Sequence, residues 1–138
     1  MSGAGAQDQD DVVSEVVTKL SPRSVSETVM RFTDILTAKG VHLFAVIDQS
    51  AEARRVGLEL RDTTLILFGS PAAGTPVMVA VPLAAVDLPL KILVWADGAQ
   101  TKVSYVPPKV LAARYDLSPE LASHLAAIDP LTDALVAD

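Results

Sequence analysis

The sequence predicts an α+β fold in which a mostly antiparallel sheet carries its helices on one face. Five short runs of β-branched and apolar residues are suited to strands, and one strongly patterned helix lies between the first two. Later strands follow one another through short turns such as Asp97-Gly98 instead of alternating strictly with helices. The expected order is β-α-β-β-α-β-β-α.

The first half of the chain is predicted to hold a tail, a strand and the clearest helix. Residues 1–10 are small and polar and are expected to be disordered, which leaves residues 11–138 as a single domain. Residues 11–20 are rich in Val and Thr and predict a strand. Ser24 and Glu27 have the spacing of a capping box, and apolar residues then recur at helical spacing. The helix is expected over residues 24–39.

Two further strands are predicted before a segment rich in Gly, Pro and Ala. Residues 41–48 predict a buried strand, residues 51–57 a short helix or turn, and residues 58–68 a second strand. Within residues 69–89, Thr75 is placed to cap a short helix that starts at Pro76, and Pro82 is placed to start another turn.

The remaining elements are a hairpin and a helical C-terminus. Residues 90–96 and 101–106 predict two strands joined at Asp97-Gly98. A helix is expected from Pro107-Pro108 to about residue 115. A last helix is expected to be capped by Ser118, with an apolar face of Leu, Leu and Ile extending to residue 128, and a further turn starts near Asp129-Pro130.

Composition narrows the function classes. The net charge is −6 and the basic residues are scattered, so we expect no nucleic-acid partner. The chain has no cysteine and two histidines, which excludes thiol chemistry and argues against a metal site or other cofactor. Its longest uncharged run contains prolines and glycines, so we expect no membrane span. With no signal-peptide pattern at the start of the chain, a cytoplasmic protein is expected.

The candidate binding site is the uncharged segment between two strands. Backbone N–H groups where a strand meets a helix can hold an anion, but the residues of a phosphate-binding loop are missing. Two interpretations remain open, a tight structural connection and a ligand pocket. The pocket would use the following residues: Gly69, Ser70, Gly74, Thr75 and Met78, with Asp48 and Lys91 nearby.

Catalysis is the alternative to binding, and no catalytic residue is assigned. A hydrolase or isomerase could use Asp48, Asp87 and His42, provided that the three converge in one cleft. Lys91 is expected to pair with Asp87 or, alternatively, to bind an anion. His124 falls off the apolar face of its helix and is expected at solvent or in a subunit contact.

An ordered series of residues resembles the family called domain of unknown function 302 (DUF302), which comprises small bacterial and archaeal proteins. The matching segments are Gly57-Leu58-Glu59-Leu60-Arg61, Leu67-Phe68-Gly69, Pro71, Gly74-Thr75-Pro76, Met78, Pro82-Leu83-Ala84-Ala85, Asp87-Leu88-Pro89-Leu90-Lys91 and Val94-Trp95. The resemblance implies a compact α+β domain that forms homodimers, and it implies no reaction. Gln49 and Ser70 depart from the family pattern, which has His and Asn at these positions.

Three functional hypotheses follow. The first is a cytoplasmic homodimer that binds a small molecule or partner, because an uncharged segment of this length must be covered by something. In this hypothesis the segment from Gly69 to Met78 lies at the ligand site or at the subunit interface. The second is the enzyme described above. The third is a structural scaffold that dimerises and binds no ligand.

Overall fold

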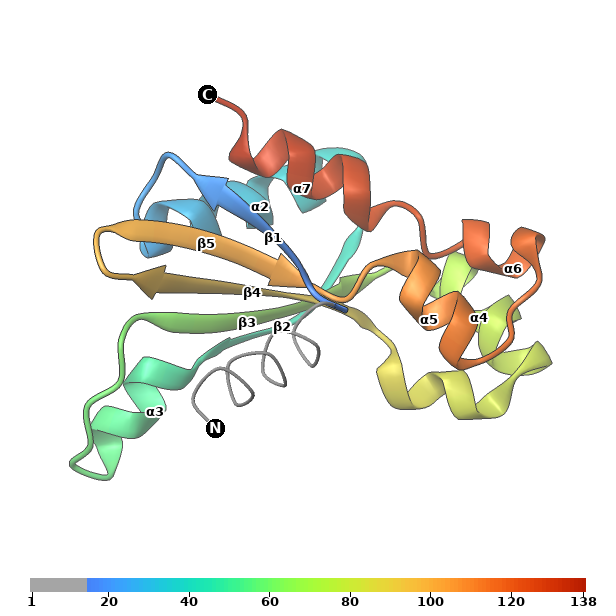
Figure 1. Ribbon diagram of the computed structural model, residues 1–138, viewed down its shortest axis with the longest axis horizontal. Coiled ribbons are helices and arrows are strands. Elements are labelled where there is room, and N and C mark those ends of the chain that lie inside the picture. The colour runs from blue at the N-terminus through green and yellow to red at the C-terminus, as the bar shows by residue number, and fades with distance from the viewer. Residues whose placement is uncertain (1–14) are drawn as a thin grey trace, which may run out of the picture.

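Five strands form one fully antiparallel sheet in the computed structural model, which describes residues 15–138 (Figure 1). The order across the sheet is β1-β5-β4-β3-β2, so β1 and β2 are its two edges. The strands are β1 (Val17–Ser21), β2 (His42–Asp48), β3 (Thr63–Gly69), β4 (Leu90–Asp97) and β5 (Gln100–Tyr105). The predicted α+β class is confirmed. The predicted tail and residues 11–14 of the first predicted strand lie outside the described residues.

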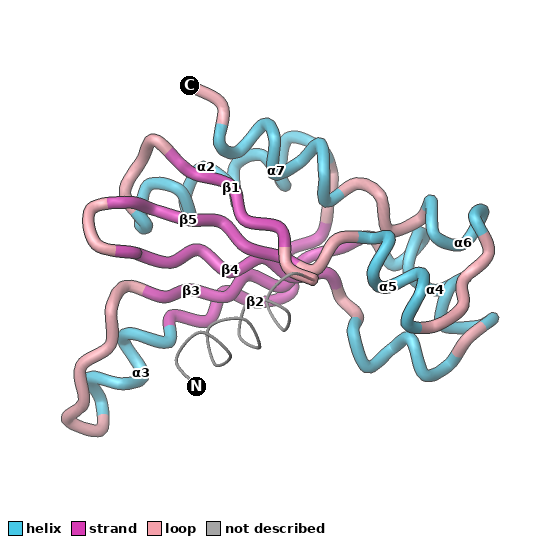
Figure 2. The backbone as a smooth tube through the Cα atoms, in the orientation of Figure 1, coloured by secondary structure: helices cyan, strands magenta, loops and turns pink. Residues whose placement is uncertain are grey.

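Within residues 15–138, seven helical segments accompany the sheet. They are α2 (Val25–Lys39), α3 (Gln49–Arg55), α4 (Pro71–Ala80), the 3-10 helix η1 (Pro82–Asp87), α5 (Pro108–Arg114), α6 (Pro119–Ser123) and α7 (Ile128–Val136). Helices α2 and α7 pack together on one face of the sheet. Figure 2 shows α4, α5 and α6 gathered at one end of the strands, while α3 extends from the other end.

Helix α2 begins and ends where local sequence signals predict. The Ser24 hydroxyl accepts the N–H of Glu27 at 3.2 Å, and the Glu27 carboxylate accepts the N–H of Ser24 at 3.2 Å. These reciprocal bonds satisfy backbone donors that the first turn leaves free. Gly40 ends the helix at φ 69°, a conformation that side chains with a Cβ rarely adopt.

The core lies between α2 and the sheet. Phe32 and Leu36 of α2 are buried against Ile66 and Phe68 of β3 and against their neighbours on β4 and β5. The rings of Phe32 and Phe68 meet edge to face, with centroids 5.0 Å apart.

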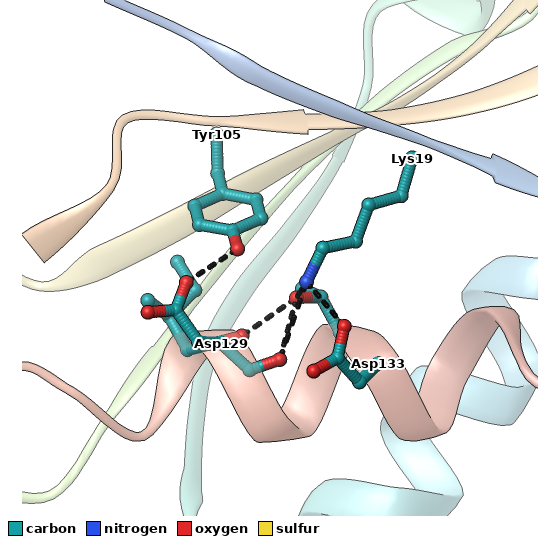
Figure 3. Close-up of polar contacts among 6 residues, drawn as sticks. Lys19, Tyr105, Asp129 and Asp133 are labelled. Atoms are coloured by element: carbon teal, nitrogen blue, oxygen red, sulfur yellow. Dashed lines mark hydrogen bonds and ion pairs between the residues drawn. The ribbon is translucent and has the colours of Figure 1, made fainter.

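Polar contacts attach α7 to α2 and to β1. Arg31 donates to the carbonyls of Ala134 and Leu135 at 3.0 and 3.2 Å, which occupies acceptors at the C-terminal end of α7. From β1, the Lys19 ammonium donates to Thr132 Oγ1 at 2.7 Å and pairs with Asp133 at 2.8 Å (Figure 3).

A hydroxyl from β5 completes this cluster. Tyr105 donates to Asp129 Oδ1 at 2.5 Å, and its ring lies 5.2 Å from the Lys19 ammonium (Figure 3). The sheet and α7 are therefore joined by charged hydrogen bonds as well as by apolar packing.

Two predictions about β2 and β3 were wrong. The strand predicted over residues 58–68 begins only at Thr63, and Leu58 and Leu60 lie exposed in an extended segment outside the sheet. The strand predicted over residues 41–48 is not buried, because β2 is an edge strand on which Phe44 is 48% exposed.

The helices after β3 and after β5 also differ from prediction. Helix α4 begins at Pro71, five residues before the predicted start, with Ser70 as its N-cap residue and Pro76 inside it. The last helix, predicted to extend to residue 128, ends at Ser123 as α6, and α7 begins at Ile128, where a further turn was predicted near Asp129-Pro130. The first error arises because Pro71 and Pro76 both suit the first turn of a helix. The second arises because the helical spacing of Leu121, Leu125 and Ile128 continues across the turns at residues 124–127.

The packing of α2 predicts that substitutions on its buried side destabilise the protein far more than substitutions on its exposed side. Replacing Phe32, which is fully buried, with Ala should lower the free energy of unfolding by about 3–5 kcal/mol, because a cavity is left beside Phe68. Met30 on the same helix is 65% exposed, and Met30→Ala should change the free energy of unfolding by less than about 0.5 kcal/mol. Urea denaturation of both variants measures the difference, and equal losses would contradict this account of the core.

Candidate functional site

The segment predicted to form the site borders an apolar cavity of about 200 Å³. Gly69 is the last residue of β3, and Ser70 stands where the strand becomes α4. Pro71, Ala73, Gly74 and Met78 of α4 line one wall, and Gly69, Leu88, Pro89 and Leu90 line the floor. The peptide bond between Leu88 and Pro89 is cis.

Two distant parts of the chain complete the cavity. Phe44 from edge strand β2 closes one side, and its ring packs edge to face on His42 with centroids 4.4 Å apart. His124 and Leu125, which follow α6, close another side. Leu125 is buried and His124 is partly exposed.

The lining determines what the cavity can hold. Among the described residues that line it, His124 is the only titratable side chain and Ser70 carries the only hydroxyl. An apolar cavity favours an apolar group, and one or two polar side chains at its rim fix orientation. The site suits binding better than acid–base chemistry, because its described lining is almost entirely apolar and holds one titratable side chain, with no second polar group beside it other than the Ser70 hydroxyl.

The structure brings together four of the seven predicted site residues: Gly69, Ser70, Gly74 and Met78. Thr75 lies on the same helix but points away from the cavity lining and is exposed. Asp48 lies at the opposite end of β2, where it caps α3 through the N–H of Ala51 at 2.9 Å. Lys91 lines a separate cavity of about 210 Å³ together with Asp87.

Phe44, Leu88, Leu125 and His124 were not predicted as site residues. Phe44, Leu125 and His124 reach the cavity only through the tertiary fold, so local sequence offers no signal for them. Leu88 lies within the uncharged segment 69–89 but was not chosen there. His124 was expected at solvent or in a subunit contact, and it is partly exposed where it lines the cavity.

The three residues of the enzyme hypothesis do not converge. His42 and Asp48 occupy the two ends of β2, and Asp87 ends η1 beside α5. Hydrogen bonds from Ser50 and from the N–H of Ala51 hold the pKa of Asp48 below its ordinary value. Asp48 is thus occupied as a helix cap.

Asp87 is held by partners from α5 and its C-terminal end. Arg114 donates to Asp87 Oδ2 at 2.9 Å, and the Tyr115 hydroxyl donates to the same oxygen. The expected Asp87–Lys91 pair is replaced by this contact with Arg114. Burial raises the pKa of Asp87, but the bonds from Tyr115 and Arg114 and the charges of Arg114 and Lys91 outweigh it, so the pKa lies below its ordinary value.

The lowered pKa predicts a pH-dependent contribution to stability. Asp87→Asn should lower the free energy of unfolding at neutral pH by about 1–2 kcal/mol, because two charge-assisted hydrogen bonds are lost. The unfolded state binds the proton more readily, so the wild-type advantage is complete above the ordinary Asp pKa of 3.8 and is lost as pH falls through the lowered native value.

Denaturant unfolding across pH measures this difference, and Tyr115→Phe should reproduce part of it. If the wild-type protein kept its full advantage in free energy of unfolding at the lowest pH, the lowered pKa of Asp87 could not be its cause.

Two absences within the described residues bear on function. No helix within residues 15–138 combines the length and apolar character needed to cross a bilayer. In the same range, no three His, Asp or Glu side chains gather as they would around a metal ion.

Known proteins resemble this chain in sequence or in fold. A crystal structure of an uncharacterized conserved DUF302 protein from Bacillus stearothermophilus matches with a TM-score of 0.74 and 20% identity, over 88% of this chain and 94% of that one. Two proteins described as "Fluoride-specific ion channel FluC 1", from Brucella suis biovar 1 and Brucella abortus biovar 1, are 36% identical over 105 residues. This match covers 75% of the chain, but it spans only 41% and 39% of those longer proteins.

The family model "Domain of unknown function DUF302" matches residues 17–135. This match and the shared fold confirm the resemblance read from the sequence. The chain belongs to the DUF302 family.

Proposed function

We propose that this chain is a cytoplasmic, homodimeric domain that binds a small, mainly apolar molecule in the cavity bordered by Gly69–Met78. The observation that carries the proposal is the cavity itself, which four separate parts of the fold line with apolar groups. The absence of cysteine suits a reducing compartment.

The size of the cavity defines the ligand class. An engineered apolar cavity of about 150 Å³ holds benzene, so a cavity of about 200 Å³ accommodates a single aromatic ring with a small substituent, or a short branched alkyl group. His124 and Ser70 at the rim would meet a polar substituent of that ligand.

A substitution that fills the cavity should abolish binding. Ala73 lines the cavity, whereas its neighbour Ala72 is exposed and does not. Toluene and p-cresol serve as probes, with binding followed by the amide signals of Gly69 and Gly74 in ¹⁵N-labelled protein. Ala73→Leu should weaken binding by at least about tenfold, because the added isobutyl group occupies the probe's volume. Ala72→Leu should leave it unchanged.

Thermal unfolding of both variants checks that the fold is retained. Equal weakening by the two substitutions, or probe-induced shifts confined to residues outside the cavity, would contradict the proposed site. If neither probe binds the wild-type protein, the result favours the hypothesis of a structural scaffold that binds no ligand.

A second function is favoured by the fluoride-channel relatives. The stretch they share with this chain is less than half of their length, and no helix of the described residues can cross a bilayer. We propose that the shared stretch is an accessory domain of those channels and that this chain serves a fluoride-specific ion channel in the same way. Fluoride itself is a poor ligand for the apolar cavity, because a strongly hydrated anion needs donors there.

Growth of the source organism in fluoride tests this second function. Deletion of the gene should increase fluoride sensitivity, and complementation with the wild-type gene should restore tolerance. Unchanged sensitivity would oppose it while leaving the cavity proposal intact.

A further inference from the structure

A second cavity, of about 210 Å³, lies on the face of the sheet that α2 does not cover. Leu65 of β3, Leu93 of β4 and Ser104 of β5 line it as direct cross-strand neighbours. Side chains alternate between the two faces of a strand, and the adjacent residues Ile66 and Ile92 are buried in the core under α2. The row from Leu65 to Ser104 therefore faces the opposite way.

The remaining walls come from the end of the sheet where α5 follows β5 (Figure 1). Leu111 of α5 and Val16, which precedes β1, are apolar, and Asp87 is the last residue of η1. Leu90 is the only described residue that this cavity shares with the one bordered by Gly69–Met78. The two cavities are thus separate sites.

Two opposite charges stand in an otherwise neutral lining. Among the described residues that line this cavity, only Asp87 and Lys91 are charged. The Tyr105 hydroxyl donates to a carboxylate of α7 at 2.5 Å, and the Ser104 hydroxyl accepts the indole N–H of Trp95 at 3.0 Å. Polar recognition of a ligand therefore falls to Asp87 and Lys91.

The Lys91 ammonium lacks a counter-ion within residues 15–138. Arg114 takes the ion pair with Asp87 at 2.9 Å, and no other carboxylate in that range pairs with Lys91. Lys91 is partly buried and lies two positions before Leu93, so its side chain leaves the same face of the sheet. A cation held beside apolar side chains without a counter-ion is costly, so this position favours a bound anion.

Asp87 keeps one carboxylate oxygen for a ligand. Arg114 and Tyr115 both donate to its Oδ2. No donor within the described part of the chain bonds to Oδ1, and an ionised carboxylate can accept several hydrogen bonds. The cavity thus offers an acceptor for a cationic group as well as a cation for an anionic group.

We infer that this second cavity binds a free α-amino acid with an apolar side chain. The ligand carboxylate pairs with Lys91, the ligand ammonium donates to Asp87 Oδ1, and the side chain packs among the leucines that line the cavity. An engineered apolar cavity of about 150 Å³ holds benzene, so one of about 210 Å³ accommodates an isobutyl or benzyl group. The inference does not depend on the ligand proposed for the first cavity.

Three probes that share one apolar group test the two charged contacts. L-leucine carries both charges, 4-methylpentanoate lacks the ammonium, and 3-methylbutylamine lacks the carboxylate. Each is titrated at neutral pH into the ¹⁵N-labelled full chain, with binding followed by the amide signals of Leu65, Leu93 and Ser104. L-leucine should bind at least about tenfold more tightly than either analogue, because each analogue loses one charge-assisted hydrogen bond. Equal affinity for L-leucine and either analogue, or no L-leucine binding, would overturn the inference.

Matched lysine substitutions locate the anion contact. Lys91→Met should weaken L-leucine binding by at least about tenfold and remove its advantage over 3-methylbutylamine. Lys109 is exposed on α5 and does not line the cavity, so Lys109→Met removes the same charge and should leave L-leucine affinity unchanged. Thermal unfolding confirms that both variants fold. Equal affinities of the two variants for L-leucine would contradict the role of Lys91.

The first cavity provides a control for the position of the ligand. Ala73→Leu should leave L-leucine binding unchanged while it blocks toluene, because Ala73 lines only the first cavity. L-leucine shifts centred on Gly69 and Gly74 would place the amino acid in the first cavity and overturn the inference. Failure of toluene to bind would count against the first site alone, so the two failures are distinguishable.

Discussion

The edge-to-face contact between Phe32 and Phe68 fixes the position of the candidate site. Phe68 is the last core side chain of β3, and the next residue, Gly69, lies on the cavity floor. Phe32 of helix α2 packs against Phe68. Hydrogen bonds from Arg31 to two carbonyls of α7 fix the position of α2 in turn. The chain thus leaves the core at a point set by aromatic packing, and α4 starts from that point.

The elements that the sequence predicted best are those whose signals are local. The capping box at Ser24 and Glu27 and the left-handed Gly40 depend on residues within one turn of each helix end. The helix after β3 was misplaced because Pro71 and Pro76 both suit a first turn, and only packing of Val77 against the core separates the two. Leu58 and Leu60 match a strand by pattern, yet no neighbouring strand pairs with them among the described residues.

The candidate site was half predictable for a similar reason. Gly69, Ser70, Gly74 and Met78 are close in sequence, so an uncharged segment after a strand was enough to find them. Phe44 precedes that segment by 25 positions and His124 follows it by 46, and their approach depends on how β2 pairs with β3 and how α6 packs near α4. Asp48 was misassigned because a carboxylate at a strand end serves equally well as the cap of the next helix.

The walls of the cavity differ in how firmly the fold holds them. On its floor, Gly69 and Leu90 belong to the central strands β3 and β4. By contrast, α4 buries Val77 alone among its described residues, and α6 has no fully buried residue in that range. Segments with few buried contacts open most readily, so a ligand that touches both floor and wall favours one arrangement of α4.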